Sequence, residues 1–184
     1  MPNADWATTA EQAALLRILV QLKGAKNVLE IGTFTGHATL ALALAVGENG
    51  RVTTCDMAAG WGEMGQRFWR PARVDNRIDQ RIGRAQIIMA ELLLEGQRGA
   101  FDFIFLDADR ENYASYLPLI SQLLGGGGIL VADDVLGSGE FAENGDDYGE
   151  TQSLRAFNGT LHGDQDFDLV MLPFGRGMTL AIKQ

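Results

Sequence analysis

Two patterns of apolar and polar residues alternate along this chain, one typical of β-strands and the other of α-helices. Short apolar runs with strand character are separated by longer stretches in which apolar residues recur every three or four positions. The predicted strands are residues 28–31, 51–55, 78–82, 101–106, 129–132, 167–172 and 178–183, and the predicted helices are residues 9–22, 37–45, 85–97, 113–124 and 150–161. This alternation favours an α/β fold with a doubly wound, Rossmann-like, mostly parallel sheet.

Glycine-rich segments punctuate the second half of the chain. The run of glycines at 125–128 ends the preceding helix, because a helix interior loses about 1 kcal/mol for each glycine. A polar, acidic loop is expected over residues 136–149. The short link at 173–177 suits an antiparallel hairpin, so the last part of the sheet is predicted to be antiparallel.

Length and charge narrow the range of partners. The chain has 184 residues, which fits a single domain over residues 1–184. Its net charge is −9 and it has no cluster of Lys and Arg, whereas nucleic-acid binding depends on a basic face that neutralises phosphates. We therefore expect a small-molecule ligand and no nucleic acid, although the charge can equally serve only to keep the chain in solution.

Cysteine usage and the apolar runs indicate the compartment. The single cysteine, Cys55, cannot form an internal disulfide, and no Cys or His spacing suggests zinc. Residues 1–14 lack the basic start and apolar core of a signal peptide. The longest apolar run, residues 38–46, is too short to span a bilayer. We expect a cytoplasmic protein with no membrane partner.

The first candidate site is the loop that follows the first predicted strand. Its spacing is Glu30-x-Gly32-x-x-x-Gly36, which differs from the Gly-x-Gly-x-x-Gly of dinucleotide binders. Glycines there let the backbone turn sharply and approach a ligand. Glu30 would repel a phosphate but suits a cation, such as a methionine ammonium or a sulfonium. The alternative is an ordinary strand–turn–helix junction.

Asp56 ends the second predicted strand, about twenty residues beyond the glycine loop, where an acid can accept both ribose hydroxyls. Met57 follows it and could cover an adenine face. The alternative is that Asp56 is only a helix N-cap.

Carboxylates also follow two later strands. Asp107 and Asp109 come after the strand at 101–106, and Asp133 and Asp134 come after the strand at 129–132. Ends of neighbouring parallel strands face the same crevice. Asp107, Asp133 and Asp134 could therefore meet at one point, where an all-oxygen ligand set suits Mg²⁺ or Ca²⁺. The alternative is that Asp109 and Asp134 simply cap helices or turns.

These motifs together carry a family resemblance. The chain resembles the metal-dependent class I O-methyltransferases of the catechol and caffeoyl-coenzyme-A type. Residues 30–36 match the pattern Glu-Ile-Gly-x-x-Thr-Gly, and residues 107–113 match Asp-Ala-Asp-Lys-x-Asn-Tyr except at one position. Residues 133–134 stand where the family has Asp-Asn, and residues 172–180 match Leu-Pro-x-Gly-x-Gly-x-Thr-Leu.

The resemblance implies a seven-stranded methyltransferase sheet whose last strand is antiparallel. It implies that S-adenosylmethionine is the methyl donor and that a small phenolic or catechol-like acceptor receives the methyl group on a hydroxyl. The implied cofactor-binding residues are Glu30, Gly32, Thr33, Phe34, Gly36, His37, Asp56, Met57, Ala85, Gln86 and Asp107. Mg²⁺ or another divalent cation would be held by Asp107, Asp133 and Asp134, and would acidify an acceptor hydroxyl bound to it. Asp107 and Arg110 are the implied catalytic residues.

Three departures from the family pattern change the expected chemistry. Arg110 stands where the family has a Lys that could act as a base, and arginine keeps its proton in proteins. Asp134 replaces a metal-binding Asn, so the site has three carboxylates. Only eight residues precede the helix that begins at Thr9, whereas family members carry further helices that help form the acceptor pocket. We expect that pocket to be open, or to be completed by the loop at 136–149 or by a second copy in a homodimer.

Five isolated residues are more typical of structural roles. His37 is expected as the first residue of a helix and His162 as a solvated turn residue. Trp61, Phe68 and Trp69 are expected to pack, although Trp61 is close enough to Asp56 in sequence to cover adenine.

Two other functions stay open at this point. One is a metal-independent methyltransferase that acts on another small nucleophile, with a structural aspartate cluster. The other is a protein that binds S-adenosylmethionine with little turnover. A nicotinamide dehydrogenase is disfavoured by Glu30 and by the absent third glycine. The sequence names neither the acceptor nor the oligomeric state.

Overall fold

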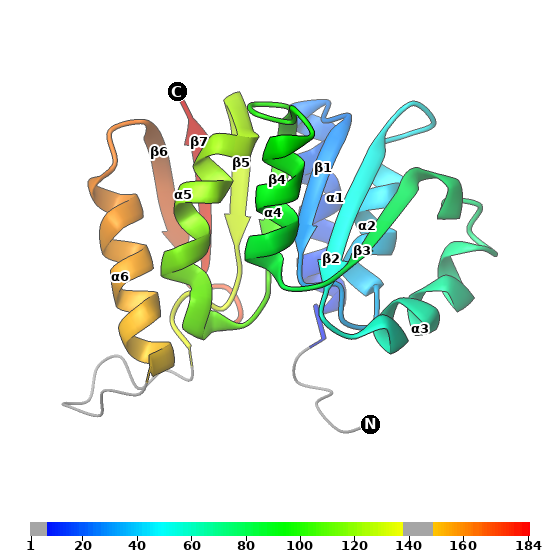
Figure 1. Ribbon diagram of the computed structural model, residues 1–184, viewed down its shortest axis with the longest axis horizontal. Helices are drawn as coiled ribbons and strands as arrows, with labels where there is room; N and C mark the ends of the chain where they lie inside the picture. The colour runs from blue at the N-terminus through cyan, green and yellow to red at the C-terminus, as the bar shows by residue number, and fades with distance from the viewer. Residues whose placement is uncertain (1–6, 138–148) are drawn as a thin grey trace. The chain divides into compact units, whose positions relative to one another are not determined.

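The computed structural model describes residues 7–137 and 149–184 (Figure 1), so most of the loop predicted at 136–149 lies outside the described residues. The described residues contain seven strands in the order β3-β2-β1-β4-β5-β7-β6. The chain divides into two compact units, Met1–Ile88 and Met89–Gln184. The prediction of one domain over residues 1–184 stays a prediction.

The first unit contains three parallel strands in the order β3-β2-β1. They are β1 (Asn27–Ile31), β2 (Arg51–Asp56) and β3 (Ile78–Ile82), and the helices are α1 (Ala10–Lys23), α2 (His37–Ala45) and α3 (Ala59–Trp69), with a 3₁₀ turn η2 at Asp75–Arg77. The register pairs Glu30 with Thr54 and Ile31 with Cys55, which brings the ends of β1 and β2 level. Helix α4 (Ala85–Leu94) begins in this unit and ends in the next.

Helices α1 and α3 differ in how clearly the local sequence predicts them. Thr9 and Gln12 form a reciprocal capping box at the start of α1, and Gly24 ends that helix in the left-handed conformation. Helix α3 is not among the predicted helices, because its glycines disfavour a helix. Gly65 is needed for packing, because a Cβ there would lie 2.4 Å from Cζ2 of Trp69. A Cβ at Gly62 would lie 1.5 Å from Nε2 of Gln80, the end of a flexible side chain that packs on this glycine.

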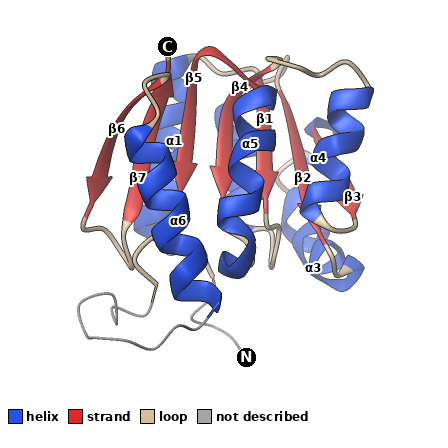
Figure 2. Ribbon diagram, turned by 60° about the vertical axis from the view of Figure 1, so that its left-hand side comes forward, coloured by secondary structure: helices blue, strands red, loops and turns tan. Residues whose placement is uncertain are grey.

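The second unit contains four strands in the order β4-β5-β7-β6. They are β4 (Phe101–Leu106), β5 (Leu124–Ala132), β6 (Phe167–Leu172) and β7 (Met178–Lys183), and the helices are α5 (Tyr113–Leu123) and α6 (Gly149–Gly163), with a 3₁₀ turn η3 at Arg110–Asn112. Strand β4 is parallel to β5, whereas β7 is antiparallel to both β5 and β6. Figures 1 and 2 show α5 and α6 side by side on one face of these strands.

The predicted fold class is confirmed: the structure is an α/β fold with a mostly parallel, seven-stranded sheet and an antiparallel C-terminal strand. One boundary differs, because β5 begins at Leu124 and includes the glycine run. The register passes from Phe101↔Leu124 to Phe103↔Ile129, so the glycines form an irregular segment within the strand. In the described residues, no helix is long and apolar enough to cross a membrane.

Candidate active site

The carboxyl ends of β1, β2 and β3 are tied together in the first unit. The Gly32 N–H donates to the Cys55 carbonyl at 3.0 Å, and the Gly83 N–H donates to the Asp56 carbonyl at 3.0 Å. These bonds hold the glycine loop after β1 beside the end of β2. The predicted cofactor residues from Glu30 to Met57 therefore converge at one edge of this unit, as ligand sites do in parallel sheets.

The glycine loop depends on left-handed backbone geometry. Gly32 has a φ of 103° and Gly36 a φ of 77°, and Phe34 has a φ of 43° although it carries a side chain. A Cβ at Gly36 would lie 2.5 Å from Cζ2 of Trp69, whose indole N–H donates to the Gly36 carbonyl at 2.9 Å. Gly36 is thus required both by its conformation and by the close approach of Trp69.

Glu30 is fully buried among threonine hydroxyls. Its Oε2 accepts hydrogen bonds of 2.5 Å from both Thr39 Oγ1 and Thr54 Oγ1. The Thr54 proton is used in this way, so the 2.7 Å contact between Thr33 and Thr54 has the Thr33 hydroxyl as donor. Burial raises the pKa of Glu30 from 4.5 to about 8, with the two threonine bonds opposing the shift. Its Oε1 is buried without a hydrogen-bond partner among the described residues.

Asp56 connects the loop to the segment that follows β2. Its Oδ2 accepts from the Phe34 N–H at 2.9 Å, and its Oδ1 accepts from the Ala58 N–H at 3.0 Å. The N-cap residue of α3 is Ala58, so the alternative of Asp56 as a helix N-cap is wrong. Its carboxylate is half-buried and holds the strained Phe34 in place.

The remaining predicted cofactor residues lie around this edge with different exposure. Met57 is 67% exposed, and Ala85 and Gln86 are half-buried at the start of α4. His37 is exposed at the start of α2, and its Nδ1 donates to the Thr8 carbonyl at 2.9 Å. Asp107 belongs to the second unit, and its role toward the cofactor stays a prediction.

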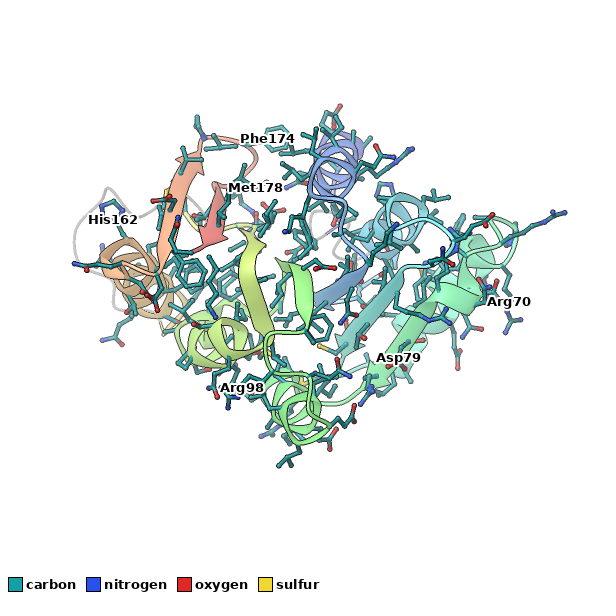
Figure 3. All side chains as sticks on the ribbon, turned by 90° about the horizontal axis from the view of Figure 1, so that it is seen from above. Arg70, Asp79, Arg98, His162, Phe174 and Met178 are labelled. Atoms are coloured by element: carbon teal, nitrogen blue, oxygen red, sulfur yellow. The ribbon has the colours of Figure 1, made fainter. Side chains whose placement is uncertain are left out.

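The aromatic and histidine side chains behave largely as structural residues. Trp69 is buried, while Trp61 packs against Phe34 with ring centroids 4.5 Å apart. Phe68 differs from the packing expectation because it is 60% exposed. His162 is exposed, as expected, although it lies in the last turn of α6 rather than in a loop (Figure 3).

Strands β4 and β5 end side by side in the second unit. The Asp133 N–H donates to the Leu106 carbonyl at 2.9 Å. The buried Tyr113 hydroxyl accepts from the Ala108 N–H at 3.3 Å and donates to the Asp133 carbonyl at 3.1 Å. Asp107 and Asp133 thus follow two joined strand ends. Burial raises the pKa of Asp133 from 3.8 to about 6, and repulsion from Asp134 adds to the shift.

Asp134 is bound by two guanidinium groups. Its Oδ2 accepts from Arg110 Nη2 at 2.7 Å and from Arg176 Nη2 at 2.5 Å, and its Oδ1 accepts from Arg176 Nε at 3.1 Å. Arg110 Nη1 also donates to Glu150 Oε1 at 2.9 Å. Burial lowers the pKa of Arg110, but the bond to Glu150 and the charge of Asp134 outweigh burial and raise it. Both oxygens of Asp134 are therefore engaged by cations.

Arg176 and Glu150 are not among the predicted site residues, although both contact this group of side chains. Arg176 occupies a variable position of the Leu-Pro-x-Gly-x-Gly motif in the link between β6 and β7. The pairing of Ala132 with Thr179 across β5 and β7 brings that link next to Asp134. The sequence signal that could have found Arg176 is the predicted antiparallel last strand. If this strand pairs with β5, the link that precedes it lies at the carboxyl end of β5, next to Asp134. The strand order needed for that inference is a tertiary property.

The predicted metal ligands do not form a ligand set. Over residues 7–137 and 149–184, no three His, Cys, Asp or Glu side chains gather in a group that could hold a metal ion. Asp107 and Asp133 lie at joined strand ends, but Asp134 is paired with Arg110 and Arg176. A divalent cation at Asp134 would meet two positive charges already in place.

The fold, and the glycine loop flanked by Glu30 and Asp56, are typical of a methyltransferase. Comparison with known proteins identifies the class of methyltransferase. The family model described as O-methyltransferase matches residues 1–184, and the chain belongs to this family, as predicted.

Several relatives share most of the chain. It is 36% identical over 177 residues to probable caffeoyl-CoA O-methyltransferase 1 of Dictyostelium discoideum, covering 96% of this chain and 77% of the relative. It is 39% identical over 182 residues to catechol O-methyltransferase domain-containing protein 1 of Mus musculus, covering 99% and 70%. The O-methyltransferase TomG of Streptomyces achromogenes, solved in complex with SAM, superposes with a TM-score of 0.91 at 30% identity, covering 98% of this chain and 83% of TomG.

Proposed function

We propose that this protein transfers the methyl group of S-adenosylmethionine to a hydroxyl of a small phenolic or catechol-like acceptor. The observation that carries the proposal is the edge of the first unit, where a buried glutamate and a strand-end aspartate flank a left-handed glycine loop. Membership of the O-methyltransferase family and the SAM complex of TomG support the same assignment.

The residues of the first unit fit this cofactor. Bound S-adenosylmethionine would supply a methyl group on a cationic sulfonium. Within the part of the chain that the structure describes, Glu30 Oε1 is buried without a hydrogen-bond partner, and a nearby cation would favour the ionised form of this carboxyl group. Asp56 can accept from ribose hydroxyls while it holds the Phe34 N–H. Gly32 and Gly36 let the backbone approach the ligand closely.

The acceptor is inferred from the relatives and from charge. The relatives are named as a probable caffeoyl-CoA O-methyltransferase and a catechol O-methyltransferase domain-containing protein, and these names support a phenolic hydroxyl as the acceptor group. Arg110 can stabilise an oxyanion, but it cannot remove the proton, because its pKa is raised above an already high value. The net charge of −9 favours a small molecule over a nucleic acid as the substrate.

Assistance by Mg²⁺ is the part of the predicted mechanism that the residues do not fit. The two guanidinium groups on Asp134 oppose a dication at that carboxylate. We therefore derive no step through a metal ion. The same contacts favour the second candidate function, a metal-independent methyltransferase acting on a small nucleophile.

The test is a binding and transfer experiment on the whole chain. Calorimetric titration with S-adenosylmethionine and S-adenosylhomocysteine measures cofactor binding. Transfer of a tritiated methyl group is then screened over catechols, flavonoids and hydroxycinnamates, with and without Mg²⁺. The proposal fails if neither nucleoside binds. Binding without transfer to any acceptor would favour a cofactor-binding protein with little turnover. Cytoplasmic location and a homodimer stay predictions.

A further inference from the structure

The two residues that depart from the family pattern in the second unit bind each other. Arg110 replaces the expected Lys, Asp134 replaces the expected Asn, and their side chains meet at 2.7 Å. Arg176 joins them with two hydrogen bonds to Asp134, at 2.5 and 3.1 Å. We call this group the Arg–Asp–Arg cluster. The carboxylate of Asp134 is thus paired with two arginine side chains.

The backbone holds Arg176 in this position. The Leu136 N–H donates to the Arg176 carbonyl at 2.9 Å, and the Val135 N–H donates to the Gly177 carbonyl at 3.0 Å. A Cβ at Gly177 would lie 2.5 Å from Cγ of Leu136, so the link packs closely against the chain that follows Asp134. These backbone hydrogen bonds and this packing fix the backbone of Arg176, so its guanidinium group is held in a two-bond contact with Asp134.

Arg110 is held by a second carboxylate from a different element. It lies in η3 and donates to Asp134 at the end of β5 and to Glu150 at the start of α6. The side chain of Arg110 is 18% exposed and that of Asp134 is 12% exposed, so water screens this pair only partly. An ion approaching Asp134 would meet the positive charge of both arginines.

We propose that the Arg–Asp–Arg cluster takes the place of the divalent cation in this protein, so that methyl transfer proceeds without one. The inference rests on the proposed function. It has a consequence for the substrate class: a cation held by the protein selects acceptors with two adjacent oxygens that chelate it. Without that cation, an acceptor with a single hydroxyl serves as well as a catechol.

The first test uses Mn²⁺ as the probe and binding as the readout. Wild-type protein saturated with S-adenosylhomocysteine is titrated with Mn²⁺, and bound ion is measured by electron paramagnetic resonance. We expect no saturable binding below about 1 mM, an affinity near the weak end of the usual scale. One Mn²⁺ bound per chain at micromolar concentrations would overturn the proposal, and loss of that binding in Asp134→Ala would locate the ion at this carboxylate.

Variants of Arg176 test the cause. Arg176→Gln frees one side of Asp134, and we expect Mn²⁺ affinity to rise at least about tenfold. Arg176→Lys keeps the charge and should bind Mn²⁺ as weakly as wild type. Arg98→Gln is the matched control: Arg98 is an exposed arginine of the same unit, bonded to Gln122, and its loss changes the net charge equally (Figure 3). An equal rise in the Arg98 variant would attribute the effect to net charge and refute the cluster.

The substrate consequence is measured with a matched pair of acceptors. Methyl transfer to a catechol and to the corresponding monophenol is compared in the presence of a chelator. We expect both rates to persist, with the monophenol within about threefold of the catechol, a difference well below one tenfold step in rate. Loss of transfer on chelation overturns the proposal. If Arg176→Gln does not fold, the wild-type titration and this comparison decide alone. Failure of S-adenosylhomocysteine to bind refutes instead the proposed function.

Discussion

Both units place carboxyl groups at the ends of parallel strands, but the hydrogen-bond donors to these groups differ between the units. In the first unit, Glu30 accepts from threonine hydroxyls and Asp56 from backbone N–H groups, all of them neutral donors. In the second unit, Asp134 accepts from two guanidinium groups. Neutral donors leave these carboxyl groups able to pair with a cation that binds beside them, whereas the guanidinium groups already neutralise Asp134. Carboxyl groups at strand ends therefore suit a cationic ligand in one unit and oppose a cation in the other.

The largest effect is expected from Gly36→Ala in the first unit. The new Cβ would meet Trp69 at 2.5 Å and would occupy a left-handed conformation, so we expect a loss of about 2–4 kcal/mol in the free energy of unfolding. Gly24→Ala is the control, because Gly24 has a φ of 67° but nothing lies within 4 Å of its Cβ position. Urea unfolding measures both. Equal losses would show that Trp69 packing contributes nothing.

Asp134→Ala comes next and addresses the second unit. Removing the carboxylate leaves Arg110 and Arg176 close together without their shared partner. Breaking a buried ion pair costs about 3–5 kcal/mol, and partial exposure of Arg176 reduces the expected loss to about 2–3 kcal/mol. Asp134→Asn keeps the shape and should destabilise the protein less. A loss below about 0.5 kcal/mol in the alanine variant would mean that the Arg–Asp–Arg cluster is not a stable contact.

Asp56→Ala tests the neutral-donor site through ligand binding. The variant lacks an acceptor for ribose hydroxyls, and the half-exposed position limits the effect to about 1.5–2 kcal/mol, or roughly a 10- to 30-fold loss of affinity. Calorimetric titration with S-adenosylhomocysteine measures it. Asp79→Ala is the control, since Asp79 is an exposed carboxylate of the same unit. Unchanged affinity in Asp56→Ala would remove this residue from the cofactor site.

The smallest effect on cofactor affinity is a pH dependence set by Glu30. Burial raises its pKa to about 8, so the folded protein keeps the proton while the unfolded chain ionises from about pH 4.5 upward. The contribution of Glu30 to the free energy of unfolding therefore falls between about pH 4.5 and 8 and then levels off. A cationic cofactor favours the ionised form, so its affinity should rise a few-fold as the pH increases from 6 to 8, within the limit of about tenfold per pH unit.

Glu30→Gln separates this contribution from other titrations. The variant should show a flatter dependence of both unfolding free energy and S-adenosylmethionine affinity over the same range. Calorimetry and urea unfolding at several pH values measure the two slopes. Identical slopes in wild type and variant would mean that Glu30 does not titrate there.

Much of the fold was readable from sequence because its signals are local. Each predicted strand overlaps an observed strand, and the loop from Glu30 to Gly36 joins β1 to α2 as expected. The spacing of apolar residues, and a glycine in a left-handed conformation, each affect the backbone conformation of only a few neighbouring residues. Helix α3 was not predicted because Gly62 and Gly65 disfavour a helix locally, and the approach of Gln80 from β3 to Gly62 follows only from the tertiary structure.

Which side chains contact Asp134 depends on the tertiary structure. The sequence alone determined that carboxylates follow β4 and β5, and from that pattern a three-aspartate metal site was the natural prediction. Arg176 lies 42 residues from Asp134, and only the antiparallel placement of β7 beside β5 brings them together. Charge interactions depend on distance in space rather than separation along the chain, so the partner that neutralises Asp134 emerges only once the strands are in order.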